Sequence, residues 1–175
     1  MKFTEQRLKG LYLVELEPHI DERGTFARQF CKREFSEHGI DIEICQCNVS
    51  KNYKKGTLRG LHFQQQPFPE PKIVCCMQGR IFDVAVDLRE GSPTYLDWLA
   101  FELDGETGRM LYIPPGFAHG FQVMADNTLV YYMLGNYFNS AYYDGVRWDD
   151  PKIGIEWPEC ANRIINERDR KYELL

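Results

Sequence analysis

The clearest alternation of side chains in this chain runs through Ile81-Phe82-Asp83-Val84-Ala85-Val86-Asp87-Leu88. In an extended backbone, successive side chains point to opposite faces, so Phe82, Val84, Val86 and Leu88 share one face, and Ile81, Asp83, Ala85 and Asp87 share the other. A period of two over this length predicts a β-strand. Turn-forming residues bound it on both sides, at Gln78-Gly79 and at Glu90-Gly91-Ser92-Pro93.

Similar short runs recur along the chain, separated by glycine and proline. We expect further strands at residues 12–16, 44–53, 57–64, 72–78, 95–103, 110–113, 120–124 and 128–134. Residues 33–38 are the one clear helical stretch, with the charged tail after Asn162 as a second candidate. Many short strands at regular spacing predict an all-β sandwich or barrel with a few short helices. With no internal repeat or linker, we expect residues 1–175 to form a single domain.

The composition excludes several classes of protein. Hydrophobic residues make up 43% and charged residues 27%, which excludes a disordered chain. The net charge of −5 disfavours binding to nucleic acid, which needs a basic surplus. No apolar export or membrane segment is visible, and six cysteines without a Cys-x-x-Cys pair suggest buried free thiols. We therefore expect a cytoplasmic protein that binds neither nucleic acid nor membrane.

The four histidines are the first candidates for chemistry. His19 and His38 lie in polar segments and are expected on the surface. His62 belongs to the strand-like run Thr57-Leu58-Arg59-Gly60-Leu61-His62-Phe63-Gln64. In a regular strand Arg59 and His62 would face opposite ways, but a bulge at Gly60 would bring both to one side. From this pattern alone, a satisfied core histidine and a functional imidazole are equally compatible.

His119 ends a Pro-x-Gly-x-x-His spacing that starts at Pro114 and resembles the second histidine motif of the cupin superfamily. Metal-binding cupins carry a His-x-His pair in the first motif, whereas this chain has His62 followed by Gln64. Two imidazoles without a companion carboxylate make a poor metal site, so no metal is expected.

Lys72 and the pair Tyr131-Tyr132 leave alternatives open. A lysine at the start of a strand is usually a solvated edge charge, but Lys72 could instead point into the barrel and stabilise negative charge. Only one of the two adjacent tyrosines can face inward, and alternation does not say which.

Taken together, these motifs resemble the dTDP-4-dehydrorhamnose 3,5-epimerase family. The resemblance spans nearly the whole chain through segments at residues 21–26, 46–50, 56–64, 82–89, 113–121, 145–150 and 154–158. It implies a double-stranded β-helix jelly roll, similar to a cupin barrel, that works as a homodimer without metal or cofactor. The implied substrate is a nucleoside-diphospho-4-keto-6-deoxy sugar, inverted at C3, C5 or both.

The resemblance also implies roles for individual residues. His62 would be the general base, oriented by Asp169, while Lys72 would stabilise the enolate and Tyr132 would return a proton on the opposite face of the sugar. The implied substrate-binding residues are Arg23, Phe26, Gln46, Asn48, Arg59, His119 and Arg168. Of these, Gln46 and Asn48 would contact the nucleotide. Arg23 would reach the diphosphate in the partner subunit's site.

Three positions depart from the pattern of the family. Arg28 and Tyr143 stand where well-known members carry glutamates associated with substrate binding, and Phe138 replaces a tyrosine found in many relatives. One extra residue between Gln46 and His62 indicates a reshaped loop. These departures leave open which nucleotide is bound and which carbon is inverted. A nucleotide-sugar-binding module without activity is the non-enzymatic alternative.

Overall fold

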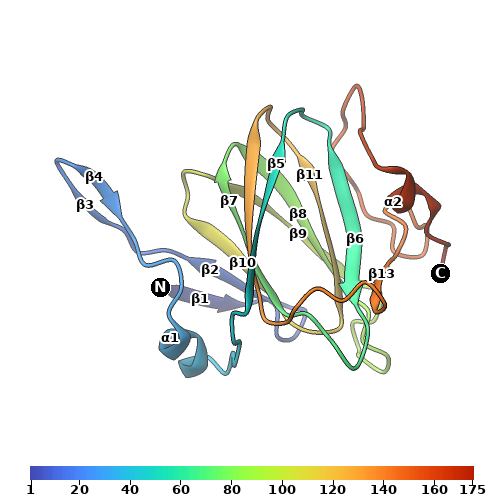
Figure 1. Cartoon of the computed structure of the whole chain (residues 1–175), viewed down its shortest axis with the longest axis horizontal. Coiled ribbons are helices and arrows are strands. Elements are labelled where there is room, and N and C mark those ends of the chain that lie inside the picture. The colour runs from blue at the N-terminus through green and yellow to red at the C-terminus, as the bar shows by residue number, and fades with distance from the viewer.

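Two antiparallel sheets lie face to face in the computed structural model, which describes all 175 residues (Figure 1). The six-stranded sheet has the order β1 (Lys2–Glu5), β2 (Tyr12–Glu15), β10 (Arg109–Ile113), β7 (Lys72–Gln78), β12 (Thr128–Leu134) and β5 (Gln46–Asn52). The five-stranded sheet has the order β13 (Tyr143–Gly145), β6 (Leu58–Gln64), β11 (Phe117–Val123), β8 (Arg80–Asp87) and β9 (Trp98–Asp104). This arrangement confirms the predicted all-β fold.

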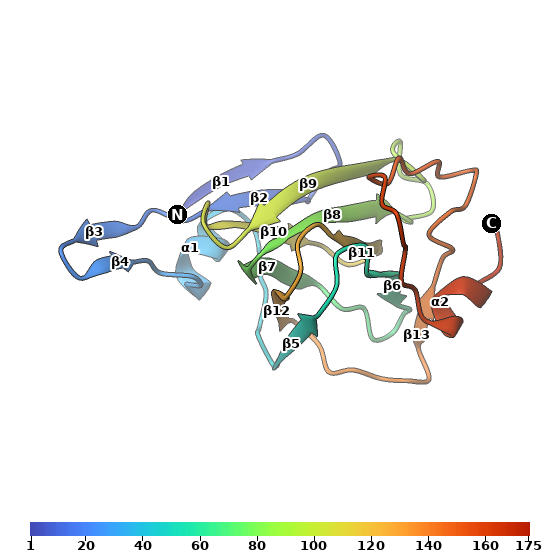
Figure 2. The same cartoon turned by 90° about the horizontal axis from the view of Figure 1, so that it is seen from above.

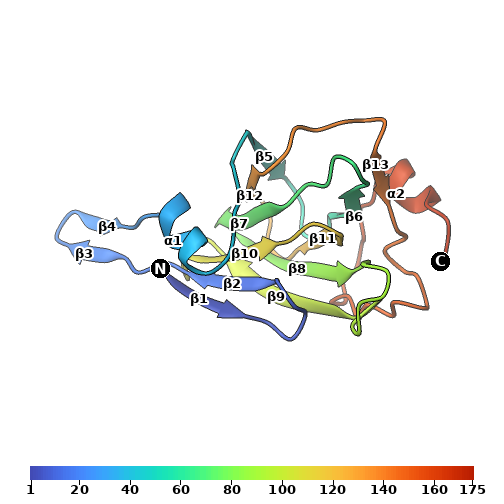
Figure 3. The same cartoon turned by 90° about the horizontal axis from the view of Figure 1, so that it is seen from below.

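Two short helices and a hairpin complete the chain. Helix α1 spans Lys32–Glu37 and α2 spans Glu167–Lys171, close to the two predicted helical stretches. The hairpin of β3 (His19–Asp21) and β4 (Gly24–Phe26) projects from one end of the sandwich, and α2 lies at the other end (Figures 2 and 3). Neither helix has the length and the apolar character that crossing a membrane requires.

The nine predicted strands all form, with two notable shifts. The strand predicted at 95–103 begins only at Trp98, because Leu96 has a φ of 68° inside a turn that ends at Asp97. The strand predicted at 120–124 begins already at Phe117, so His119 is part of the sheet. The prediction missed β1, β3, β4 and β13, which have three or four residues each and are too short for alternation to reveal.

The core has three layers, and β8 contributes to two of them. Ile81 and Ala85 point between the two sheets, into a cluster that includes Val74 and Val130 of the opposite sheet. Val84 and Val86 point to the other face of the five-stranded sheet, where they pack under the C-terminal segment. Both faces of β8 are therefore covered. The outer face of the six-stranded sheet is covered in part by α1 and the segment that follows it, through Phe35, Ile40 and Ile42.

The cysteines differ from the expected pattern in burial. All six are free, and Cys75 and Cys76 are buried on opposite faces of β7, as adjacent strand residues must be. Cys47, however, is exposed, because it lies on the outward face of the edge strand β5. The expectation of buried thiols is therefore wrong for Cys47. Cys31, Cys45 and Cys160 are only half-buried.

Candidate active site

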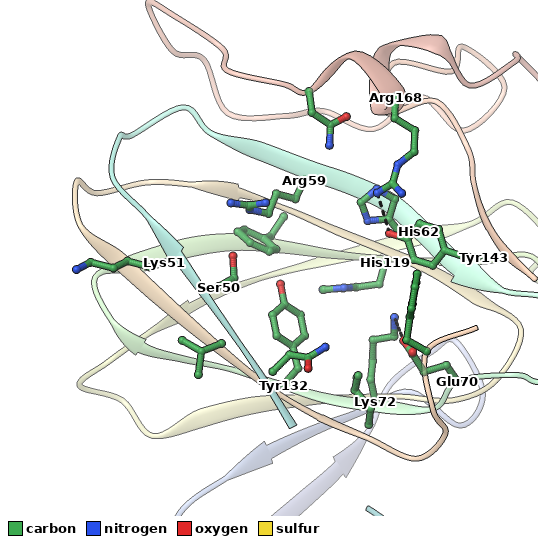
Figure 4. Close-up of a pocket in the computed structure, with 16 residues that line it drawn as sticks. Ser50, Lys51, Arg59, His62, Glu70, Lys72, His119, Tyr132, Tyr143 and Arg168 are labelled. Carbon is green, nitrogen blue, oxygen red and sulfur yellow. Dashed lines mark hydrogen bonds and ion pairs between the residues drawn. The ribbon is translucent and has the colours of Figure 1, made fainter. Parts of the chain in front are cut away.

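A cavity of about 460 Å³ opens between the two sheets, toward the end that carries α2 (Figure 4). Its walls come from β6, β11 and β13 of one sheet and from β5, β7 and β12 of the other. The residues that line it are Asn48, Val49, Ser50, Lys51, Arg59, His62, Glu70, Lys72, His119, Phe121, Tyr132, Leu134, Phe138, Tyr143, Asn166 and Arg168. The sequence-predicted residues among them are therefore brought together from segments far apart in the chain.

A bulge at Gly60 places Arg59 and His62 on the same wall. His62 pairs with His119 and Arg59 pairs with Phe121, so two residues of β6 lie opposite the single Gly120 of β11. Gly60 has a φ of 134°, and a Cβ atom there would lie 2.5 Å from the Cα atom of Gly120. Glycine is thus required at position 60 by both conformation and space. The bulge predicted from the sequence is confirmed.

His62 is held by a buried carboxylate from the C-terminal helix. Its Nε2 atom lies 2.8 Å from Oδ1 of Asp169, whose side chain has no exposed surface. The other carboxylate oxygen accepts a hydrogen bond of 3.1 Å from the backbone N–H of Gly60. Asn166 caps α2 by accepting a hydrogen bond of 2.7 Å from the Asp169 N–H. The helix cap, the bulge and the imidazole are therefore parts of one connected arrangement.

This pairing fixes the protonation of the His62 ring. An ionised carboxylate can only accept a hydrogen bond, so Nε2 carries the proton and the lone pair of Nδ1 is left free. Burial lowers the pKa of His62 below its ordinary value of 6.5, and the bond to Asp169 opposes this only in part. Burial raises the pKa of Asp169, but the His62 hydrogen bond and charge and the Gly60 N–H together lower it below 3.8. At neutral pH the pair is a neutral imidazole beside a carboxylate.

Lys72 is a buried cation that points into the cavity. Its side chain is only 8% exposed, and its Nζ atom lies 2.8 Å from Oε1 of Glu70 (Figure 4). Lys72 is the first residue of β7, which has a neighbouring strand on each side. It pairs with Ile113 of β10 and with Leu134 of β12. Of the two alternatives for Lys72, the solvated edge charge is therefore wrong. Glu70 was not anticipated, because it stands in a loop between two prolines and carries no periodic signal.

Tyr132 is the tyrosine that faces inward, whereas Tyr131 packs on the outer face of the sheet. Burial, together with the nearby Asp83 carboxylate, raises the pKa of Tyr132, so the phenol keeps its proton at neutral pH. Tyr132 belongs to the sheet opposite the one that carries His62. A protonated phenol and an unprotonated imidazole thus line opposing walls of the same cavity.

His119 forms a second buried histidine–carboxylate pair. Its Nε2 atom lies 2.7 Å from Oδ1 of Asp83, and neither side chain is more than 5% exposed. The second oxygen of Asp83 is buried without a hydrogen-bond partner. The His119 ring is edge-on to the ring of Tyr132, with ring centroids 6.2 Å apart. Asp83 was visible in the alternation of β8, but nothing in the sequence linked it to His119.

Basic side chains surround the rest of the cavity. The Arg59 Nε–H donates a hydrogen bond of 2.8 Å to the side chain of Asn52. The guanidinium of Arg168 lies 4.7 Å from the ring centre of Tyr143. Asn48 lines the cavity, and Gln46 lies beside it, with its amide donating to Asn48 at 3.2 Å. Gln46 itself is not part of the wall.

Arg23 and Phe26 lie outside this cavity. Both belong to the projecting β3–β4 hairpin, where Phe26 is 75% exposed and the side chain of Arg23 is 85% exposed and paired with Asp21. Neither contacts the cavity of its own chain. Their assigned roles in substrate binding remain predictions, and they require a second subunit.

Gln64, at the position of the second histidine in the first cupin motif, has all of its side-chain polar atoms hydrogen-bonded within the protein. The Gln64 amide N–H groups donate to the carbonyl oxygens of Phe68 and Tyr137, and its oxygen accepts from the N–H of Asn139. No group of three or more His, Cys, Asp or Glu side chains has an arrangement suited to a metal ion. The Gln64 side chain instead ties together the two loops at the rim of the cavity.

Comparison with known proteins supports the resemblance. The sequence profile of the dTDP-4-dehydrorhamnose 3,5-epimerase family matches residues 5–175. An enzyme of that name from Methanothermobacter thermautotrophicus is 42% identical over 176 residues, covering 99% of this chain and 94% of that protein.

Two solved structures are also similar. The Bacillus anthracis dTDP-4-dehydrorhamnose 3,5-epimerase, with TDP and PPi bound, superposes with a TM-score of 0.96 at 37% identity, covering 99% of both chains. The dTDP-6-deoxy-D-glucose-3,5-epimerase from Legionella pneumophila, solved with dTDP-4-keto-L-rhamnose, has a TM-score of 0.94 at 34% identity, covering 99% of this chain and 92% of that one. The match to the family profile, the similar sequences and the similar folds show that this chain belongs to the dTDP-4-dehydrorhamnose 3,5-epimerase family.

Proposed function

We propose that this protein inverts C3 and C5 of dTDP-4-dehydro-6-deoxy-glucose to give dTDP-4-dehydro-rhamnose. The observation that carries the proposal is the His62–Asp169 pair, joined at 2.8 Å, on the wall of a cavity that Lys72 and Tyr132 also line. The ligands named for the two similar structures, TDP and dTDP-4-keto-L-rhamnose, support the choice of nucleotide and sugar.

The chemistry follows from the acidity of hydrogens next to a ketone. The free Nδ1 of His62 takes the proton from C3 or C5, the electron pair of the C–H bond forms a double bond to C4, and the π electrons of the C4 carbonyl move onto its oxygen to give an enolate. The ammonium of Lys72 stabilises that negative charge. Tyr132 then donates its phenolic proton to the same carbon from the other side, which inverts the stereocentre. The Tyr132 phenolate then takes up a proton from the bulk solvent, and the His62 imidazolium releases its proton to the solvent. These two transfers restore the starting state.

The positive charge of the site is local. Arg59 and Arg168 line the cavity although the protein as a whole carries a net charge of −5, whereas the side chain of Lys51 points away from it, over the ring of Tyr53 (Figure 4). Arginine and lysine side chains suit a diphosphate, because both pair with phosphate oxygens. We assign the diphosphate to this basic part of the cavity, with Asn48 and the adjacent Gln46 toward the nucleotide.

We infer further that the protein acts as a homodimer in which Arg23 and Phe26 complete the site of the partner. The hairpin that carries them projects from the sandwich and exposes Ile20 (76%) and Phe26 (75%), which contact nothing in their own chain that would bury them. The uncovered part of the six-stranded sheet exposes Val49 (62%) and Met77 (47%). Exposed apolar side chains on a sheet face and on an arm are typical of an interface between subunits.

The six cysteines are free thiols, which fit a reducing compartment, and we therefore propose that the protein is cytoplasmic.

Inversion at a single carbon is the second candidate. Phe138 lines the cavity where many relatives carry a tyrosine, so no phenol at that position can donate a proton or a hydrogen bond.

Deuterium counting separates these reactions. The protein is incubated in D2O with the 4-keto-6-deoxyglucose derivatives of dTDP, CDP and GDP, and the product is analysed by NMR. We expect deuterium at both C3 and C5 of the dTDP sugar, with inverted configuration. Deuterium and inversion at one carbon would establish the narrower reaction. Absence of exchange with every nucleotide would contradict an enzymatic role.

A further inference from the structure

Glu70 is the only acidic residue among the sixteen that line the cavity. It and its partner Lys72 are both 8% exposed, and the ion pair between them measures 2.8 Å. A carboxylate facing a cavity built for a doubly charged anion is unfavourable unless its charge is compensated. The close contact with Lys72 provides that compensation, which indicates that the role of Glu70 is to pair with the Lys72 ammonium.

The backbone around Glu70 is fixed on both sides. Glu70 stands between Pro69 and Pro71, whose rings restrict the chain. The Pro69 carbonyl accepts a hydrogen bond of 3.1 Å from the Asn136 side chain, and the Pro71 carbonyl accepts one of 2.8 Å from the Gly135 N–H. The carboxylate is therefore presented from a rigid segment rather than from a mobile loop.

Lys72 needs such a partner. A lysine side chain has a flexible four-carbon stem, and its ammonium group is strongly hydrated in water. Glu70 is its only ion-pair partner in the structure. The other charged or titratable groups that line this part of the cavity are His62 of β6, His119 of β11, Tyr132 of β12, Tyr143 of β13 and Arg168 of α2. The Asp169 and Asp83 carboxylates lie behind the two histidines and are paired with them rather than with Lys72.

We propose that Glu70 is a positioning residue of this active site, which holds the Lys72 ammonium in the cavity where the negative charge of the enolate develops. The pair leaves two of the three ammonium N–H groups free for the substrate. The link to the enolate rests on the proposed function. The link to Lys72 rests only on the geometry.

A double-mutant cycle tests the catalytic part of this proposal. Glu70→Gln keeps the size and a hydrogen-bonding oxygen but removes the charge, and Glu70→Asp keeps the charge but shortens the reach. We expect Glu70→Gln to lower kcat about 10²-fold, with dTDP affinity unchanged and a smaller loss for Glu70→Asp. In a Lys72→Met background, Glu70→Gln should have no further effect, because the two residues act as a unit. The positioning role would be overturned if the two losses of kcat multiplied in the double variant, or if Glu70→Gln kept the wild-type kcat.

A matched control and a second readout separate this proposal from the function itself. Glu15→Gln removes a carboxylate that pairs with Arg109 at 3.3 Å and with Lys2 at 3.6 Å outside the cavity, and its kcat should match the wild type. The ¹⁵N–¹H signal of the buried Lys72 ammonium should be visible by NMR in the wild type and lost in Glu70→Gln. If the wild-type protein does not epimerise the sugar, the proposed function fails, yet loss of this signal still supports the positioning role. Persistence of the signal in Glu70→Gln overturns that role.

Discussion

His62 and Asp169 are 107 residues apart in the chain, yet Nε2 of the imidazole lies 2.8 Å from Oδ1 of the carboxylate. The contact needs the bulge at Gly60, which turns His62 into the cavity, and the cap of α2 by Asn166, which brings Asp169 beneath it. The short C-terminal helix is therefore part of the catalytic apparatus in the proposed mechanism.

Asp169→Asn tests the role of the carboxylate. An asparagine at this position can donate its amide N–H to Nε2, which stabilises the tautomer with the proton on Nδ1 and removes the free lone pair. We expect kcat to fall by about 10²- to 10⁴-fold while the protein remains folded. The ¹⁵N chemical shifts of the His62 ring should report the change of tautomer. A tautomer that changes without loss of kcat would contradict the assignment of Nδ1 as the base.

The pH dependence of the reaction should reflect His62. Only the neutral imidazole accepts a proton, and burial holds the pKa of His62 below 6.5. The base is therefore active above this lowered pKa and is lost as the pH falls through it. A pH profile of kcat/KM should show an acid limb with its midpoint below 6.5. A midpoint above 6.5 would mean that another group controls the limb, or that Asp169 stabilises the protonated ring more than burial destabilises it.

Mixed dimers test whether Arg23 acts across a subunit interface. Arg23→Ala and His62→Ala homodimers should both be weakly active or inactive. In a hybrid of the two, the site with an intact His62 receives Arg23 from the other subunit, so about half of the wild-type activity should return. Two different affinity tags allow the hybrid to be purified. If the hybrid is no more active than the parents, Arg23 serves its own chain or no site at all.

Asp87 should contribute to stability outside the active site. It is fully buried, and its carboxylate accepts hydrogen bonds from Arg89, Ser92 and Thr94. Burial raises its pKa, but these hydrogen bonds outweigh burial and lower the pKa from 3.8 to about 2. The stabilisation is thus complete above pH 3.8 and is lost as the pH falls toward 2.

From this shift, Asp87→Asn should reduce the free energy of unfolding by about 2 kcal/mol at pH 7. Denaturant unfolding at neutral and acid pH measures the effect, with the exposed Glu102→Gln as control. Equal stability of Asp87→Asn and wild type at pH 7 would contradict this assignment.

The sequence predicts the sheets better than it predicts the site. Alternation identifies β8, and the glycine beside Arg59 identifies the bulge, because both are local signals. Alternation divides side chains between two faces but does not say which face is inside, so the choice between Tyr131 and Tyr132 waits for the structure.

The carboxylates of the site show what local patterns cannot provide. Asp169 was assigned only through family resemblance, and the pairing of Asp83 with His119 was not foreseen. Glu70 was missed entirely. Each of these contacts depends on how separate strands and loops are placed in three dimensions. The hairpin bearing Arg23 lies outside the cavity of its own chain, so the predicted role of Arg23 depends on the proposed homodimer.

Exchange of the sugar protons with solvent tests the central claim most directly, namely that His62 removes one proton and Tyr132 delivers another from the opposite wall. dTDP-4-keto-6-deoxyglucose is incubated in D2O with wild type, His62→Ala and Tyr132→Phe, and deuterium and configuration are followed by NMR at C3 and C5. We predict no exchange at either carbon with His62→Ala. With Tyr132→Phe we predict deuterium incorporation with little inversion. Exchange at the wild-type rate in His62→Ala, or equal rates of inversion in Tyr132→Phe and wild type, would contradict the mechanism.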